Sequence, residues 1–316
     1  MIVHHQPEQL AELHGCVLTT GTFDGVHLGH RKLIECLVDA ARQRQVPSVL
    51  ITFHPHPRKV IRPDQPPLPL LTTTEEKLEL LQPLGIDHVV IVPFTEAFSR
   101  MSATEYVQQF LVQGFRPRAI VIGYNHHFGR HRDGNSDLLR KLAAGFHYEV
   151  IEVGRQQADD VEASSTRIRL ALQEGDVQQA TRLLTYPYFL SGTVVAGDRI
   201  GRQLGFPTAN LEPASPDKLI PGDGVYAVHA CINQSSRRYP GLTAIGKRPT
   251  VNGRTRTIET YLLDFDGQLY GCNLRIEFLH FLRPERTFPN VDELVAAMKA
   301  DEQAARMLPD LFTSLT

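Results

Sequence analysis

The stretch GTFDGVHLGH spans residues 21–30, directly after an apolar run at residues 16–20 and before a segment with helical periodicity at residues 31–43. Glycines let the backbone approach a nucleotide closely, and a helix start presents unpaired N–H groups and a partial positive charge to phosphates. His27 and His30 are spaced to donate hydrogen bonds to the charge that develops on an α-phosphate during transfer. The alternative is an ordinary strand-turn-helix connection with surface histidines. Taken alone, His-x-Gly-His leaves both interpretations open.

The pattern around this stretch favours an open α/β sheet. Short apolar runs at residues 49–53, 88–92 and 119–122 alternate with amphipathic segments. This alternation is typical of strands and crossover helices in a parallel sheet. We therefore expect a Rossmann-like α/β domain whose ligand loops lie at the carboxyl ends of the strands.

The pattern changes at Tyr186-Pro187. Beyond it, β-rich runs separated by Gly, Pro, Asn and Asp occupy residues 188–195, 224–230, 257–265 and 274–279. They predict an antiparallel β-barrel, with a hairpin turn at Asp264-Phe-Asp-Gly267 and a closing helix at residues 292–307. We expect two domains, residues 1–186 and 187–316.

Composition excludes several classes of function. Of the 316 residues, 33 are Lys or Arg and 35 are Asp or Glu, so no global field attracts nucleic acid or anionic lipid. The sequence has no long uncharged apolar run and no leader-like start. Its four cysteines form no Cys-x-x-Cys pair, which argues against structural zinc and a secreted disulfide scaffold. We expect a cytoplasmic protein that binds neither nucleic acid nor membrane.

A second phosphate signal lies at residues 164–169, SSTRIR, at the start of an amphipathic stretch that continues through residues 170–184. Ser and Thr at a helix start are ordinary N-caps. Arginines in a first helical turn, however, are disfavoured by the helix dipole. An anionic ligand would remove that penalty, so Arg169 is a candidate for binding a leaving pyrophosphate. This segment and the His-x-Gly-His turn, in this order on an α/β fold, are far more specific together than apart.

In the second half, a Gly-rich stretch at residues 197–205 leads into Pro-Thr-Ala-Asn. The hydroxyl of Thr208 and the amide of Asn210 point the same way in an extended segment and supply two hard oxygens. That suits Mg²⁺ bound chiefly through nucleotide phosphates, and the alternative is a pair of turn hydrogen bonds. Glu259 stands in a strand-like run, where an outward surface carboxylate is the ordinary explanation. The alternation leaves its face undecided.

The motifs of the first half resemble those of the bacterial bifunctional riboflavin kinase/FAD synthetase. They are residues 21–30, 53–57, 123–129 and 164–169. The resemblance implies a nucleotidyltransferase domain that transfers AMP from ATP to FMN, with His27 and His30 as catalytic residues. The ATP-binding residues that it implies are Gly21, Phe23, Asp24, His27, Gly29, His30, Asn125, Ser164, Ser165, Thr166 and Arg169.

The motifs of the second half resemble the riboflavin kinase domain of the same family. They are residues 197–211, 221–228, 245–250, 259–271, 281–285 and 301–306. The resemblance implies a six-stranded barrel with a C-terminal helix, in which Thr208 and Asn210 hold Mg²⁺ and Glu259 takes the proton of the ribityl 5′-hydroxyl. The residues that it implies for ATP and flavin binding are Gly197, Gly201, Gly205, Pro207, Thr208, Asn210 and Arg306.

The expected partners are therefore ATP, riboflavin, FMN and FAD, with flavin-dependent apoproteins as recipients of FAD. Two departures from the family pattern concern flavin contacts: His54 replaces an acidic residue and His126 replaces an aromatic one. We expect His126, His127 and His131 to be solvated loop histidines, because no Cys or carboxylate completes a metal site at recognisable spacing.

Two rival functions remain open to test. One is an adenylyltransferase for another acceptor, such as a nicotinamide or pantetheine phosphate, which the second domain argues against. The other is a non-catalytic flavin-binding protein, which is disfavoured because every proposed reactive position carries a competent residue.

Overall fold

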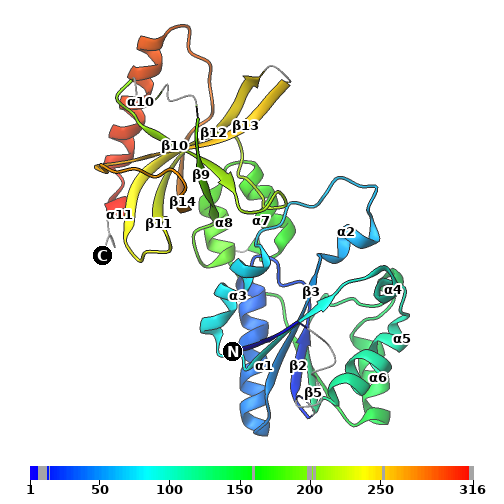
Figure 1. Cartoon of the computed structure of the whole chain (residues 1–316). Helices are drawn as coiled ribbons and strands as arrows, with labels where there is room; N and C mark the ends of the chain where they lie inside the picture. Colours follow the sequence, from blue (N-terminus) through cyan, green and yellow to red (C-terminus); the bar gives the residue numbers. More distant parts are fainter. Residues whose placement is uncertain are drawn as a thin grey trace. The chain divides into compact units, whose positions relative to one another are not determined.

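The computed structural model describes residues 1–5, 13, 15–158, 161–197, 201, 204–250 and 253–312, without the side chains at 247–250 and 253–255. The chain forms two compact units, Met1–Ser165 and Thr166–Thr316 (Figure 1). The first is an α/β unit and the second is built on a β-barrel.

A six-stranded sheet with all neighbours parallel forms the centre of the first unit, in the order β1-β4-β3-β2-β5-β6. The strands are β1 (Ile2–His4), β2 (Val17–Thr20), β3 (Ser48–His54), β4 (His88–Pro93), β5 (Ala119–Gly123) and β6 (Glu149–Val153). The predicted parallel sheet is confirmed. The edge strands β1 and β6 were not predicted, because one is three residues long and the other carries two glutamates.

Helices and short segments connect these strands. They are α1 (Leu28–Arg44), α2 (Pro57–Ile61), α3 (Thr74–Leu81), η2 (Gln82–Leu84), α4 (Glu96–Ser99), α5 (Ala103–Glu105), η3 (Tyr106–Gln113), η4 (Arg130–Arg132), α6 (Ser136–Phe146), β7 (Gln157–Ala158) and β8 (Val161–Glu162).

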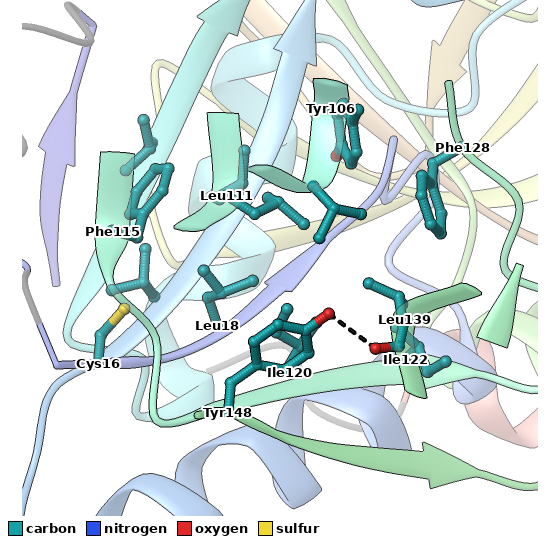
Figure 2. Packing of buried hydrophobic residues seen from close by; sticks show 14 of the residues in the cluster. Cys16, Leu18, Tyr106, Leu111, Phe115, Ile120, Ile122, Phe128, Leu139 and Tyr148 are labelled. Carbon is teal, nitrogen blue, oxygen red and sulfur yellow. Dashed lines mark hydrogen bonds between the residues drawn. The ribbon is translucent and has the colours of Figure 1, made fainter. Parts of the chain in front are cut away.

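Side chains alternate across the sheet, so each of its faces carries its own core. Leu18 and Ile120 pack with the aromatic rings of Tyr106 and Phe115 on one face (Figure 2). Val17 and its neighbours pack against the buried residues of α1 on the other face. Strands buried on both faces are expected in a parallel sheet that helices cover.

The strand order has a switch point between β2 and β5. From β2 the chain runs to β3 and β4 on one side, and it later continues with β5 and β6 on the other. Ligands of open α/β sheets bind outside the carboxyl ends of the strands at such a point. Residues 21–30 follow β2 and residues 123–129 follow β5, so the predicted nucleotide motifs lie where this rule places a ligand.

A closed antiparallel barrel forms the second unit, in the order β10-β13-β12-β11-β14-β9. Its strands are β9 (Phe189–Val195), β10 (Thr208–Pro213), β11 (Gly224–Ile232), β12 (Arg238–Thr250), β13 (Gly253–Leu262) and β14 (Asn273–Arg283). Two helices follow, α10 (Val291–Arg306) and α11 (Pro309–Phe312). The predicted six-stranded barrel with a C-terminal helix is confirmed.

The hairpin predicted at Asp264-Phe-Asp-Gly267 is wrong. It joins β13 to β14, but β13 pairs with β10 and β12, whereas β14 pairs with β11 and β9. The turn residues are present, yet after the turn the chain crosses to the far side of the barrel instead of pairing with β13.

The amphipathic stretch before the barrel forms two helices, α7 (Ser165–Gln173) and α8 (Val177–Leu184). Gly175, with φ +83°, separates them, and the Asp176 side chain caps α8. Both pack on the barrel: Gly222 N donates to Leu172 O at 2.7 Å, and α8 lies against β14. The compact second unit therefore begins at Thr166, while the boundary at 186/187 stays a prediction about where the second activity begins.

Candidate functional sites

His27 and His30 lie together at the start of α1. His27 is the N-cap, and its Nδ1 accepts a hydrogen bond from His30 N at 3.4 Å. The two rings are stacked with centroids 3.6 Å apart. A Cβ on Gly29 would come within 3.2 Å of the His27 ring, so the small residue between the histidines permits this arrangement.

Both imidazoles are arranged to act as neutral hydrogen-bond donors. Because His27 Nδ1 accepts, the proton of the neutral ring is assigned to Nε2. Burial, together with the neighbouring His27 and Lys77, holds the pKa of His30 well below its ordinary value. His30 Nδ1 is buried and has no hydrogen-bond partner among the residues described. The helix start thus offers donors without a positive imidazolium charge.

Phe23 and Asp24 shape the loop that precedes the histidines. The carboxylate of Asp24, in a residue only 2% exposed, accepts hydrogen bonds from Leu71 N at 3.0 Å and from both N and Oγ1 of Thr72 at 3.0 and 3.2 Å. The buried ring of Phe23 lies 5.1 Å from that of His30. These contacts hold the loop in place, and the predicted contact of both residues with ATP stays a prediction.

Residues 163–165, far from this loop in the sequence, contact it in the structure. Ser165 Oγ donates to Asp24 O at 2.9 Å, and Ala163 O lies 3.7 Å from where a Cβ of Gly29 would stand. Residues 163–165 therefore flank the His-x-Gly-His turn, as the predicted phosphate site requires. Helix α7 begins at Ser165 and carries Thr166 and the buried Arg169 into the second unit.

Asn125 follows β5 and is exposed, whereas the next residue, His126, is not the solvated histidine that we expected. His126 Nε2 is buried and has no hydrogen-bond partner in the described part of the chain. Burial, with smaller effects of His127 and Arg132, lowers the pKa of His126 to about 4. Its ring lies 5.6 Å from that of Phe128, which stacks on Tyr106.

The other departure, His54, and the two remaining loop histidines are exposed. His54 Nδ1 lies 3.2 Å from Thr74 Oγ1 at the start of α3, and His127 and His131 face solvent. Across the chain's described residues, no group of three or more His, Cys, Asp or Glu is placed to hold a metal ion.

In the barrel, Glu259 lies directly opposite Asn210 across the β10–β13 pair. Thr208 donates to Glu259 Oε2 at 3.4 Å, and Thr257 donates to Oε1 at 3.3 Å. Ile258 and Thr260 are buried on the other face of the strand. The structure thus brings the predicted base and the two predicted metal ligands together. It also places Glu259 on the strand face opposite the buried Ile258 and Thr260, which the alternation had left open.

The Gly-rich stretch passes close over these side chains. A Cβ on Gly197 would stand 2.2 Å from Asn210 Nδ2, and one on Gly201 would stand 2.4 Å from Phe206 O and 3.2 Å from Thr208 Oγ1. A side chain at Gly201 would collide with the backbone, and one at Gly197 would force the Asn210 side chain to move. Residues 198–200 and 202–203 of this motif lie outside the described residues.

Arg306 is engaged in ion pairs. Its guanidinium donates to both carboxylate oxygens of Asp264, at 2.9 and 2.8 Å, and to Glu302 at 2.9 Å. These hydrogen bonds lower the pKa of the Asp264 carboxyl. They fasten α10 to the segment after β13, and the predicted flavin contact of Arg306 stays a prediction.

Lys77 was missed by the sequence reasoning. It lies on α3, is only 8% exposed, and contacts Thr52 near the end of β3. The signal that could have revealed it is its spacing: Lys77 precedes the buried Leu81 by one helical turn, so a lysine stands on the apolar face of a short helix.

Comparisons with known proteins match each half of the chain to a different family model. The family model described as FAD synthetase matches residues 9–167, and that described as riboflavin kinase matches residues 184–308. A bifunctional riboflavin kinase/FMN adenylyltransferase of Listeria monocytogenes is 38% identical over 291 residues, covering 92% of this chain and 91% of the relative. One from Escherichia coli K12 is 36% identical over 292 residues, 92% of each chain.

Among solved structures, a protein described as a macrolide-efflux protein from Streptococcus pneumoniae superposes with a TM-score of 0.86 and 30% identity, covering 97% of this chain and 99% of that one. Its description names a transport function that the curated relatives above do not share. No helix within the described residues is long and apolar enough to cross a membrane. Two family models in tandem and relatives that match along nearly the whole chain identify it: this chain belongs to the family of bifunctional riboflavin kinases/FMN adenylyltransferases.

Proposed function

We propose that the barrel unit phosphorylates riboflavin with ATP to give FMN and ADP, and that the α/β unit adenylylates FMN with a second ATP to give FAD and pyrophosphate. The observation that supports this most directly is the position of Glu259 beside Thr208 and opposite Asn210. It provides a base next to two hard oxygen ligands in the unit that matches the riboflavin kinase model.

In the kinase reaction, Glu259 accepts the proton of the ribityl 5′-hydroxyl while that oxygen attacks the γ-phosphate. The bond between the γ-phosphorus and the bridging oxygen breaks, and ADP leaves. The hydroxyls of Thr208 and Thr257 hold the carboxylate in one orientation. Such positioning supplies much of the catalysis in phosphoryl transfer, because the protein forms no covalent intermediate.

In the adenylyl transfer, a phosphate oxygen of FMN attacks the α-phosphorus of ATP and pyrophosphate leaves. His27 and His30 donate hydrogen bonds to the charge that develops on the α-phosphate, at the start of the 17-residue helix α1. Ser164, Ser165, Thr166 and Arg169 bind the leaving pyrophosphate. No proton is exchanged and no nucleophilic Ser or Cys is required.

Enzymes of both kinds need a divalent metal, and we assign Mg²⁺ to this role. Thr208 and Asn210 fit it, since two neutral oxygens beside one carboxylate suit an ion that nucleotide phosphates mostly hold. When bound, Mg²⁺ offsets phosphate charge. The four cysteines are free thiols, in keeping with a cytoplasmic enzyme that passes FAD on to flavin-dependent apoproteins.

The test is to incubate the full chain with riboflavin, ATP and Mg²⁺ and to resolve the flavins by chromatography. FMN should form first and FAD afterwards. Absence of FMN would reject the kinase assignment, and failure to convert supplied FMN to FAD would reject the adenylyltransferase assignment. Nicotinamide mononucleotide and pantetheine phosphate, offered in place of FMN, test the rival acceptors. Riboflavin that binds but returns unchanged would indicate a non-catalytic flavin-binding protein.

A further inference from the structure

Lys77 places an ammonium group at the carboxyl edge of the parallel sheet. Its Nζ donates to Thr52 Oγ1 at 3.3 Å, and the Thr52 hydroxyl donates in turn to Thr22 O at 3.2 Å. Thr52 lies near the end of β3, and Thr22 lies in the loop between β2 and α1. Lys77 is therefore anchored beside the loop that carries the two histidines.

This lysine is buried without an ion pair in the part of the chain that the structure describes. Burial lowers the pKa of Lys77, and the charge of Asp24 opposes that effect only in part. Asp24 is itself engaged by the backbone of Leu71 and Thr72. A buried ammonium with one weak hydrogen bond is costly, so the site is arranged for an anion that enters it.

A second open group lies close to Lys77. The positive charge of Lys77 contributes to the lowered pKa of His30, so the two groups interact electrostatically. His30 Nδ1 is buried and lacks a hydrogen-bond partner among the described residues. Both groups border the loop between β2 and α1: Lys77 reaches it through Thr52 and Thr22, and His30 lies in the first turn of the helix that follows it.

We propose that Lys77 binds the phosphate of FMN and holds it against the α-phosphate of ATP during adenylyl transfer. This inference rests on the proposed function of the α/β unit. The attack brings two phosphates together, and their repulsion falls when a cation stands beside the attacking group. Neutral histidines donate hydrogen bonds but do not supply this charge. Lys77 supplies it at the β3 side of the loop.

A purely structural lysine would behave differently in one respect. Lys77→Met keeps the long stem and its packing but removes the buried charge, so it should leave the melting temperature unchanged or raise it. If Lys77 served stability, the same variant would melt earlier. The melting temperature and the rate of FAD formation of this variant therefore distinguish a structural lysine from a phosphate-binding one.

The experiment compares the full-length parent, Lys77→Met and a matched control, Lys141→Met, which removes an exposed lysine on α6 of the same unit. FAD formation is measured over a range of FMN and ATP concentrations, with riboflavin phosphorylation and the melting temperature on the same preparations. We expect kcat/KM for FMN to fall by about 10² to 10³ in Lys77→Met, by analogy with the loss of one preorganised electrostatic contact. The KM for ATP and riboflavin phosphorylation should change less than about twofold, as after surface substitutions, and Lys141→Met should match the parent.

Three results would overturn the inference: parental kcat/KM for FMN, a rise in the KM for ATP alone, or a lower melting temperature with a matching loss of both activities. If the parent itself forms no FAD from FMN, the proposed function fails instead. The parental assay thus separates failure of the function from failure of the role assigned to Lys77.

Discussion

The hydroxyl of Thr208 donates a 3.4 Å hydrogen bond to one carboxylate oxygen of Glu259, across the antiparallel pair of β10 and β13. Thr257 donates to the other oxygen at 3.3 Å. A solvent-facing strand glutamate would sample many rotamers, whereas these two contacts hold Glu259 beside a predicted metal ligand. Such contacts are what the proposed role of Glu259 as a base requires.

Glu259→Gln should therefore lower the turnover of riboflavin phosphorylation by about 10² to 10⁴, the usual range for general-base help. The variant keeps the shape of the side chain and removes its basic oxygen, so ATP and riboflavin binding should change little. Supplied with FMN, it should still form FAD at close to the parental rate. Turnover within about twofold of the parent would show that Glu259 is an ordinary surface residue and that the kinase has a different base or none.

Local signals were sufficient for most of the fold. The apolar runs around residues 17–20 and 119–123 and the helix that starts at Leu28 are encoded by periodicity within a few residues, and these parts are confirmed. The crossing from β13 to β14 was missed because an Asp-Gly turn does not specify which strands pair.

The site was predictable only where its residues are close in sequence. Thr208 and Asn210 share one strand, and their alternation indicated a common face. The contacts of Lys77 and of the half-buried His126 depend on packing between segments far apart in the chain, so local spacing could indicate at most that Lys77 is buried and not what surrounds it. The contact of Ser165 with Asp24 joins residues 141 positions apart, and only a family resemblance could anticipate it.

His30→Ala should lower FMN adenylylation by about 10² to 10³, the cost of removing one preorganised donor, while riboflavin phosphorylation survives. His27→Ala would also remove the cap of α1, so His27→Asn is the better companion, because Asn supplies a capping acceptor. Both activities are measured on one preparation of each variant. An equal loss of both in a folded variant would show that the activities are assigned to the wrong units.

The stability of the folded protein should depend on pH, because folding lowers the pKa of two histidines. Unfolded His126 takes up a proton near pH 6.5, whereas the folded protein takes it up only near its pKa of about 4. The unfolded state therefore binds more protons in this window, and stability is full above about pH 6.5 and falls as the pH drops toward 4. His30, whose pKa is also lowered, acts in the same direction.

Replacing His126 by Phe should flatten this fall, because it removes a group that must stay neutral in the folded state. Melting temperatures between about pH 7.5 and 4.5 for the parent, His126→Phe and His127→Phe provide the measurement. His127 is exposed and serves as the matched control. An identical acid sensitivity in all three proteins would mean that His126 is solvated in the folded enzyme.

The ion pair of Arg306 with Asp264 offers a way to test the predicted flavin contact. Arg306→Ala should raise the KM for riboflavin if its guanidinium touches the flavin. Asp264→Asn removes only the ion-pair partner, which is largely exposed, and should cost less than about 1 kcal/mol of stability. If both variants raise the KM for riboflavin equally, Arg306 acts by fastening α10 and does not bind the flavin.

The last prediction concerns the start of the second unit. A fragment from Tyr186 contains every strand of the barrel and should phosphorylate riboflavin. It lacks α7 and α8, however, and thereby loses the hydrogen bond from Gly222 N to Leu172 O and the contact of Gln178 with His280. It also loses the apolar face of α8, formed by Val177, Ala180, Leu183 and Leu184.

A fragment from Thr166 keeps these contacts, so it should melt at a higher temperature than the fragment from Tyr186. Burial of a single large aliphatic side chain is worth about 1.5 to 3 kcal/mol, and three of the four buried residues of α8 are of that type, so the difference should be several degrees or more. Thermal denaturation and a riboflavin phosphorylation assay at low temperature decide the matter. Equal melting temperatures would show that α7 and α8 do not stabilise the barrel. If the Tyr186 fragment folds but cannot phosphorylate riboflavin while the Thr166 fragment can, the kinase domain must include α7 and α8. The barrel strands would then be complete in the shorter fragment and still insufficient for activity.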